Sequence, residues 1–306
     1  MGRNLKHQFI NAINKNFKEC MDKHSAKHSD GIGTEKIYSY ADRKNLLDVA
    51  CNFANYMKHE HSEIRMVKDI KEEHIQGFFN EKAKECSYLT LEQYRSRFNK
   101  LEKLVKNTYH VEVNYSRGYD IPITREQTEK LRSISMSKQE YSQLSGCIEA
   151  SRSAAVPGIH LSARFGLRVS EISKLQGRDI DLERNVIRII GSKGGRDREI
   201  PIRSHERSFC EEIKREVREH ERVVPLRSNS INTFLQRSLE KCGLREKYSS
   251  AKTGIHSIRK MAAQNHYDEC RANGMSIREA KQDTSQWLGH GKDRLELMNE
   301  YIERQD

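Results

Sequence analysis

Hydrophobic residues recur at helical spacing through the first third of the chain. Near the N-terminus an apolar side chain appears every three to four residues. The pattern gives way to the polar run HSAKHSDGIGT and then resumes up to about residue 109. This spacing is typical of amphipathic helices. We therefore predict an N-terminal helix or arm over residues 1–33 and a compact helical domain over residues 34–110.

Three helices are expected inside the predicted helical domain. The first runs from about Tyr40 to Tyr56 with its apolar residues on one face. Asp69 or a neighbour is expected to cap a second helix that reaches Phe79, and Thr90 to cap a third. Because no proline interrupts this stretch, nothing in it breaks the helical pattern.

The pattern changes after residue 110. Residues 111–136 contain Gly118 and Pro122 and lack helical spacing, which is typical of a connection between domains, so we predict a linker there. Residues 137–306 then form a second domain. Within it, NVIRIIGSKGGRDREIPI places two β-rich runs around a glycine-rich turn, the pattern of a hairpin. The predicted fold class is mainly α with a small β-hairpin or sheet in the C-terminal domain (α+β).

Composition and charge narrow the classes of function. The 306 residues include 55 Lys or Arg and 44 Asp or Glu, which gives a formal net charge of +11. A polyanion such as nucleic acid is a natural partner for this charge, although charge alone is a weak argument. No stretch approaches the roughly 20 apolar residues that a membrane helix needs, and the N-terminus lacks a signal-peptide core. We expect a cytoplasmic protein that does not enter a membrane.

Cysteine and histidine are scattered along the chain. The 7 cysteines show no C-x-x-C spacing, and the 13 histidines form no cluster in sequence. Disulfide frameworks and zinc ribbons bring their cysteines together in sequence. We therefore expect reduced thiols and no metal site.

Two segments of the second domain place charged residues in unusual surroundings. In GLRVSEI, Arg168 stands in an expected apolar helix three residues before Glu171. An arginine on a buried face needs a partner or an anion, although a solvated Arg–Glu pair would have the same spacing. In GSKGGR, Lys193 stands among glycines at the hairpin tip, where the backbone can approach a ligand closely. An ordinary polar turn would have the same composition.

Two further segments lie near the C-terminus. In HSIRK, His256 and Arg259 share one face of a helix that is expected to begin after Gly254, where the helix dipole also favours an anion. In WLGHG, His290 lies between two glycines, and Tyr301 follows eleven residues later on an expected short terminal helix. Taken alone, each of these residues is also compatible with an ordinary surface or packing role.

The segments together suit one reaction. Two arginines, a lysine, two histidines and a tyrosine provide charge clamps, a proton donor and a nucleophile for transfer of a phosphoryl group to a tyrosine hydroxyl. The sequence has no carboxylate cluster for Mg²⁺ and no G-x-x-x-x-G-K-[ST] loop for ATP. We therefore expect no cofactor.

This ordered set resembles the tyrosine recombinases, or phage-type integrases. The resemblance is carried by GLRVSEI, GSKGGRDREIPI, HSIRK, LGHG and the late Tyr301, and it spans the whole second domain. The helical first domain is similar in size and place to the core-DNA-binding domain of the family. The resemblance implies a two-domain clamp on double-stranded DNA at specific recombination sites. It also implies a homotetramer that acts through a Holliday junction, a nucleoid-associated location and possible accessory or directionality proteins.

The resemblance also assigns residues to the steps of strand cleavage. Tyr301 would attack the scissile phosphate and form a 3′-phosphotyrosine. Arg168 and Arg259 would bind the non-bridging oxygens and stabilise the transition state. No metal or ATP would be needed, because the phosphotyrosine conserves the bond energy for religation.

The remaining residues are assigned to protons and positioning. Lys193 would protonate the leaving 5′ oxygen, and His256 would assist proton handling at the nucleophile. His290 would hydrogen-bond the phosphate, and Glu171 would orient the arginine and histidine side chains. Candidates for DNA contact in the first domain are Arg95, Arg97 and Lys100, although a solvated helix face explains them equally well.

Some features depart from the family pattern, and several roles stay open. The eleven-residue step from His290 to Tyr301 is longer than usual, and five residues follow Tyr301, which leaves the coupling of protomers open. Integration or excision of a mobile element is the first expectation, and a Xer-like dimer-resolving recombinase is the second. A type IB topoisomerase-like enzyme shares the chemistry, and a catalytically idle DNA-binding regulator shares the fold.

Overall fold

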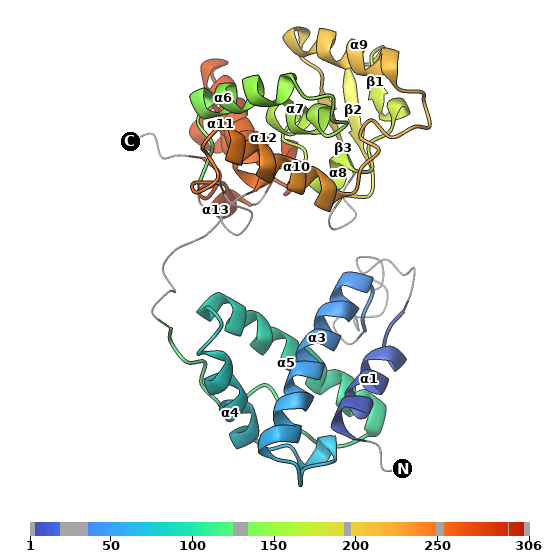
Figure 1. The fold of residues 1–306 in the computed structure, drawn as a ribbon, viewed down its shortest axis with the longest axis vertical. Coiled ribbons are helices and arrows are strands. Elements are labelled where there is room, and N and C mark those ends of the chain that lie inside the picture. Colours follow the sequence, from blue (N-terminus) through green and yellow to red (C-terminus); the bar gives the residue numbers. More distant parts are fainter. Residues whose placement is uncertain are drawn as a thin grey trace. The chain divides into compact units, whose positions relative to one another are not determined.

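The chain folds into two compact units in a computed structural model. The structure describes residues 4–18, 36–124, 134–192, 197–248, 254–292 and 294–302. Packing within the chain separates a first unit, Met1–Glu129, from a second unit, Lys130–Asp306 (Figure 1).

The first unit is built from helices. Their bounds are α1 Leu5–Lys15, α3 Tyr40–Glu60, α4 Glu72–Lys82 and α5 Tyr88–Tyr109, with a short 3₁₀ turn at Val67–Asp69. Two starts differ from prediction: Asp69 ends the 3₁₀ turn and Lys71 precedes α4, while Ser87 rather than Thr90 precedes α5. Such shifts of two or three residues are typical of helix ends placed from sequence.

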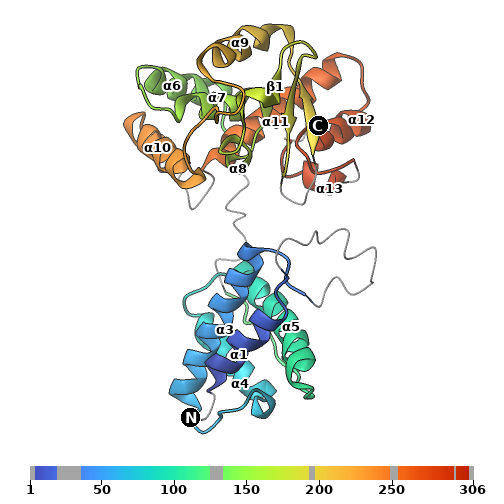
Figure 2. The ribbon, with the colours of Figure 1, turned by 90° about the vertical axis from the view of Figure 1, so that its right-hand side faces the viewer.

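Aromatic rings fill the core of the first unit. Phe53 of α3 has its ring centroid 5.2 Å from that of Phe78 and 5.0 Å from that of Phe98. Phe9 of α1 is fully buried and lies 6.1 Å from Phe53. Helix α1 is therefore part of this core, which differs from the separate N-terminal arm that we predict for residues 1–33. Its apolar stripe explains the difference, since α1 packs against both α3 and α5. Figure 2 shows α1 beside these two helices.

The chain after α5 also packs on the first unit. Tyr115 is fully buried, and its hydroxyl donates a hydrogen bond to the carbonyl of Val67 over 2.6 Å. Val113 is buried as well. The start of the segment that we predict as a linker thus lies against the helices.

The second unit combines helices with one small sheet. Strands β1 Ile180–Asp181, β2 Val186–Ile189 and β3 Arg198–Pro201 pair antiparallel in the order β1-β2-β3. Ile187 faces Ile200 across β2 and β3, so the predicted hairpin is confirmed. The helices are α6 Lys138–Glu149, α7 Val156–Phe165, α8 Val169–Ile172, α9 Arg207–Glu216, α10 Ser228–Lys241, α11 Ile255–Ala272, α12 Ile277–Trp287 and α13 Leu295–Met298.

Helix α11 is the central element of the second unit. It begins after Gly254, as predicted, and packs against both α7 and α12. Ten of its 18 residues are buried, which makes it a core helix rather than an amphipathic surface helix. The predicted fold class, mainly α with a small sheet in the C-terminal part, is confirmed (Figure 1).

The expected helix through GLRVSEI is broken, which changes the setting of Arg168. Helix α7 ends at Phe165, and Gly166 follows it with a φ of 59°, in the left-handed region. A Cβ on Gly166 would come within 2.6 Å of the Trp287 ring. Glycine is the residue that tolerates both conditions. Arg168 therefore does not lie inside a helix: it precedes α8 with extended backbone angles.

The sequence predicts that no helix of this chain crosses a membrane. Among the residues that the structure describes, no helix combines the length and apolar character needed to cross a bilayer.

The place of α1 in the core leads to a stability prediction. Phe9→Ala should lower the free energy of unfolding by about 3–5 kcal/mol, because it removes a fully buried ring from an aromatic cluster. Chemical denaturation of the full chain measures this. Lys6→Ala, on the exposed side of α1, is the control and should stay within about 0.5 kcal/mol of wild type. Equal effects of the two changes would show that α1 does not belong to the core.

Candidate active site

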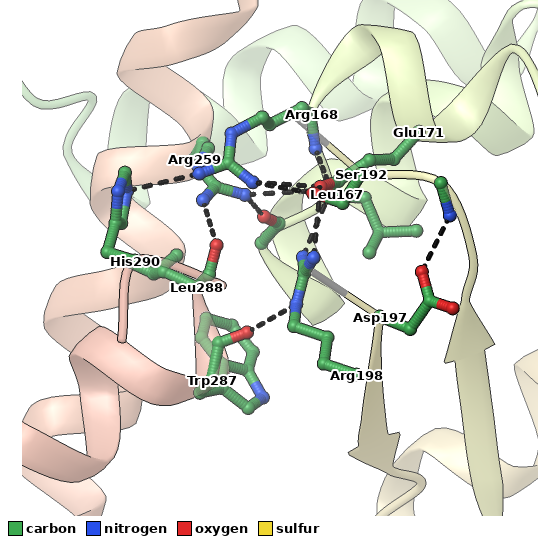
Figure 3. A network of polar contacts seen from close by, with 12 residues as sticks. Leu167, Arg168, Glu171, Ser192, Asp197, Arg198, Arg259, Trp287, Leu288 and His290 are labelled. Carbon is green, nitrogen blue, oxygen red and sulfur yellow. Dashed lines mark hydrogen bonds and ion pairs between the residues drawn. The ribbon is translucent and has the colours of Figure 1, made fainter. Parts of the chain in front are cut away.

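One buried carboxylate gathers several hydrogen-bond donors at the hairpin end of the second unit. Glu171 is 5% exposed. Its Oε1 accepts from Nη1 of Arg168 at 2.8 Å and from Nη1 of Arg198 at 2.9 Å, and its Oε2 accepts from Nη2 of Arg198 at 3.0 Å. The hydroxyl of Ser192 donates to Oε1 over 2.8 Å. Figure 3 shows these side chains converging on the carboxylate.

The break between α7 and α8 lets the backbone of Arg168 bind Glu171 as well. The backbone N–H of Arg168 has no partner within a helix and donates to Oε2 of Glu171 over 2.9 Å. The carboxylate therefore also caps α8. Burial by itself raises the pKa of Glu171, but the hydrogen bonds and charge of Arg198, the backbone N–H of Arg168 and the charge of Arg259 lower it to about 2. Glu171 is therefore ionised at neutral pH.

Arg198 is a residue that the sequence analysis does not select. It stands at the start of β3, its side chain is 8% exposed, and its Nε donates to the carbonyl of Trp287 over 2.9 Å. A Cβ on Gly289 would lie 2.8 Å from its Nη1, so the glycine makes room for it. The sequence could have indicated this position, because Arg198 is two residues from the buried Ile200 and therefore lies on the same face of β3.

Arg259 is buried more deeply than any other arginine of the site. It is 2% exposed on α11 and donates to the carbonyls of Gly166 and Leu288, the latter over 2.6 Å. Its Nε has no hydrogen-bond partner among the described residues. Burial first, and then the charge of Arg168, lower its pKa to about 10. Arg259 therefore stays charged at neutral pH.

The site carries more positive charge than its carboxylate neutralises. Arg168, Arg198 and Arg259 surround one acid, and the nearest approach of Arg259 to Glu171 is 3.9 Å. A buried charge without full compensation is costly unless an anion supplies the balance. This geometry is suited to binding an oxyanion such as a phosphate group.

His290 adds a neutral imidazole to the arginines. Its Nε2 lies 3.3 Å from Nη2 of Arg168. Because arginine only donates, Nε2 accepts in this contact and the ring proton is on Nδ1. Burial, followed by the charges of Arg259 and Arg168, lowers the pKa of His290 to about 3. His290 is therefore neutral at physiological pH.

Tyr301 lies beside both histidines. Its ring centroid is 5.3 Å from that of His256 and 5.3 Å from that of His290, and the residue is 7% exposed. It does not lie on a terminal helix as predicted: α13 ends at Met298, and Tyr301 belongs to the turn that follows. From this turn the Tyr301 ring packs against His256 of α11.

A buried lysine also contacts the tyrosine. Lys260, 2% exposed, places Nζ 5.6 Å from the centre of the Tyr301 ring and donates to the carbonyl of Glu300. Lys260 is not among the predicted site residues, although it closes the HSIRK segment. Its spacing of four residues from His256 was the available signal, since residues four apart lie on one helix face.

Lys193 lies outside the described residues. Both ends of its hairpin turn are anchored, because Ser192 donates to Glu171 and the N–H of Gly191 donates to Oδ1 of Asp197 over 2.8 Å. The described residues that flank Lys193 in the sequence are thus tied to the Glu171 carboxylate and to each other.

The predicted DNA contacts of the first unit lie on α5, and two of them are in ion pairs. Arg95 binds Glu92 over 2.9 Å, and Lys100 binds Asp42 over 2.5 Å. Arg97 is half-buried on the same helix. DNA contact by these residues stays a prediction.

Comparison with known proteins places these observations in a family. The model of the phage integrase family matches residues 124–294, which includes every residue of the site except Tyr301. No curated protein matches the sequence.

Several solved structures share the fold. A lambda integrase dimer bound to a COC′ core site is 16% identical, with a TM-score of 0.67, and the match covers 92% of this chain and 79% of that one. The Tn1549 transposon integrase in complex with transposon right end DNA is 11% identical, with a TM-score of 0.62 and coverage of 97% and 95%. A lambda integrase tetramer bound to a Holliday junction is 16% identical, with a TM-score of 0.64 and coverage of 93% and 77%.

The family match covers more than half of the chain, and the fold agrees with it over nearly the full length. This chain belongs to the phage integrase family and is a tyrosine site-specific recombinase.

Proposed function

We propose that Tyr301 cleaves one strand of duplex DNA at a specific site and holds it as a 3′-phosphotyrosine. The observation that carries this proposal is the position of Tyr301 beside His256 and His290, with His290 in turn 3.3 Å from Arg168. A nucleophile, a candidate base and a guanidinium that can bind phosphate thus adjoin one another.

The first step would be attack by the tyrosine oxygen. The Tyr301 oxygen forms a bond to phosphorus as the bond from phosphorus to the 5′ oxygen breaks. The phenol proton passes to His256, which faces the ring from the start of α11. The cation of Lys260 beside the ring favours the developing phenolate.

The arginines would stabilise the negative charge of the transition state. Arg168 and Arg259 bind the non-bridging oxygens. As the phosphate replaces Nε2 of His290 as the partner of Arg168, the ring proton of His290 shifts to Nε2, which donates a hydrogen bond to the same phosphate. The unpartnered Nε of Arg259 and the surplus charge of the site support this role. Because Glu171 and the backbone hold the guanidiniums before substrate arrives, little reorganisation accompanies the reaction.

The leaving 5′ oxygen needs a proton. We assign this step to Lys193, which follows Ser192 in the sequence, and Ser192 donates a hydrogen bond to Glu171. Attack of a 5′-hydroxyl from a partner strand on the phosphotyrosine then reverses the chemistry and joins the strands, with no metal or nucleotide required.

Integration or excision of a mobile element is the role that we propose for this reaction. The structural neighbours include the integrases of lambda and of transposon Tn1549, among them a lambda integrase tetramer on a Holliday junction. We propose the same assembly on paired recombination sites for this chain. A plasmid assay distinguishes the alternative: a topoisomerase-like enzyme relaxes supercoils without exchanging strands between sites.

The nucleophile is tested by covalent trapping. Wild-type protein incubated without metal on a nicked suicide duplex of its attachment site should give a covalent protein–DNA band, and Tyr301→Phe should abolish it. Tyr267→Phe removes a hydroxyl from a buried tyrosine of α11 and serves as the control that keeps the band. A band of equal strength from Tyr301→Phe would exclude Tyr301 as the nucleophile.

The proton donor is tested through the leaving group. Lys193→Ala should impair cleavage of an ordinary duplex but cleave a 5′-phosphorothiolate duplex at nearly the wild-type rate, because a thiolate leaves without a proton. Comparing the cleavage rates of the two substrates measures the effect. An equal defect on both substrates would assign Lys193 a different role.

Arg198 is proposed as a positioning residue, and the pH profile tests it. Arg198→Met leaves burial to raise the pKa of Glu171 without its main compensating partner. The variant should cleave more slowly, and the ratio of its rate to the wild-type rate should rise with pH as Glu171 ionises. Wild-type Glu171 is already ionised above about pH 4, and the pH dependence that both proteins share through His256 cancels in the ratio.

The control for this experiment is Arg184→Met, which removes an exposed arginine paired with Glu199 of β3. It should leave both the rate and the pH profile unchanged. A slower Arg198→Met enzyme with the wild-type pH profile would mean that Arg198 supports only the fold.

A further inference from the structure

A second polar cluster lies between α11 and α12, apart from the residues assigned to cleavage. His266 and Cys270 stand four residues apart on α11, and Asp283 stands on α12. Nε2 of His266 lies 2.6 Å from Oδ1 of Asp283, and Sγ of Cys270 lies 3.6 Å from each of these two atoms. The three groups form a triangle of one nitrogen, one sulfur and one oxygen.

We propose that His266, Cys270 and Asp283 form a binding site for a zinc-like divalent cation. A tetrahedral Zn²⁺ with ordinary bond lengths to sulfur, nitrogen and oxygen separates its ligand atoms by about 3.3–3.6 Å. The two sulfur edges of the triangle, each 3.6 Å, already have this length. The third edge is shorter because a proton lies between His266 and Asp283, and the cation would replace that proton.

The donor set selects the class of cation. A thiolate with an imidazole and a carboxylate suits Zn²⁺ and related transition metals, whereas Mg²⁺ and Ca²⁺ prefer oxygen ligands alone. Burial raises the pKa of Cys270 to about 11, so the thiol is protonated until a metal displaces its proton.

The arrangement leaves one side of the triangle accessible. The side chain of His266 is 13% exposed and that of Asp283 is 46% exposed, while Cys270 is buried. A surface hollow lined by Asn273, Met275 and Asp283 opens beside the cluster. A cation can therefore arrive from solvent, and water can occupy its fourth position.

Neighbouring groups fix the imidazole. The ring of His266 stacks on that of Trp287 with centroids 4.4 Å apart and planes at 8°. Arg203 donates from Nη2 to Nδ1 of His266 over 2.6 Å, and its Nη1 binds Glu269 over 2.6 Å. When Nε2 binds a cation, Nδ1 must carry the proton, so Arg203 withdraws toward Glu269 and the cation competes with Arg203 for the ring.

The site would join two helices that serve catalysis. Helix α11 carries His256 and Arg259, and the carbonyl of Trp287 at the end of α12 accepts from Arg198. A cation held between α11 and α12 would stabilise the packing that sets these residues. The sequence prediction of no metal site relies on the spacing of residues along the chain. Spacing cannot show that Asp283 of α12 lies next to His266 and Cys270 of α11.

Metal binding by the full chain tests this site directly. After chelator treatment and its removal, equimolar Co²⁺ should give the thiolate-to-cobalt absorption band, and Zn²⁺ should displace it and raise the midpoint of thermal unfolding. Cys270→Ser should lose the band. Asp283→Asn should bind at least about tenfold more weakly, since loss of even an outer partner of a ligand costs about 10–100-fold in affinity.

Cys147→Ser is the matched control. Cys147 interacts with Cys242 and so offers another thiol pair to a soft metal, but its loss should leave the band and affinity unchanged. Absence of a band in wild type, or a band that survives in Cys270→Ser, would overturn the proposal. This outcome is independent of the cleavage assays, because the site does not touch Tyr301 or the proposed phosphate position.

Discussion

The arrangement of the site depends on the shared hydrogen bonding of Glu171. This carboxylate receives donors from Arg168, Arg198 and Ser192, which belong to a helix start, a strand and a hairpin turn. Burial of the Glu171 carboxylate would be unfavourable without these donors, and the two arginine charges would repel each other without the carboxylate. The same carboxylate caps α8, so the start of this helix and the position of Arg168 depend on the same side chain. Removal of Glu171, or of the arginines that bind it, leaves a buried charge without a partner of opposite sign.

The remaining positive charge gives the site its chemistry. Arg259 is held by two backbone carbonyls rather than by a carboxylate, and those carbonyls belong to Gly166 and Leu288, at the ends of α7 and α12. The backbone fixes the guanidinium without neutralising it. Burial and the neighbouring arginines also hold His290 neutral, which prevents a further charge from adding to the repulsion. The result is a preorganised cationic pocket whose missing component is an anion.

Sequence reasoning identified the fold class and the ordered set of candidate residues, and it failed where tertiary contacts decide. The hairpin and the start of α11 followed from alternation and from Gly254, because both are local signals. The break at Gly166 was missed, and the Trp287 ring that leaves no room for a side chain at this position comes from far along the chain. Arg198 and Lys260 were missed because their significance comes from Glu171 and Tyr301, which reach them only in the folded unit.

The most direct test of the account asks whether Arg259 acts by neutralising the phosphate. A duplex with a neutral methylphosphonate at the scissile position removes one of the charges that Arg259 would balance. Formation of the covalent complex by Arg259→Ala should be nearly lost on the ordinary phosphate and largely restored on the methylphosphonate. An equal loss on both substrates would show that the buried charge of Arg259 serves the fold and not the reaction.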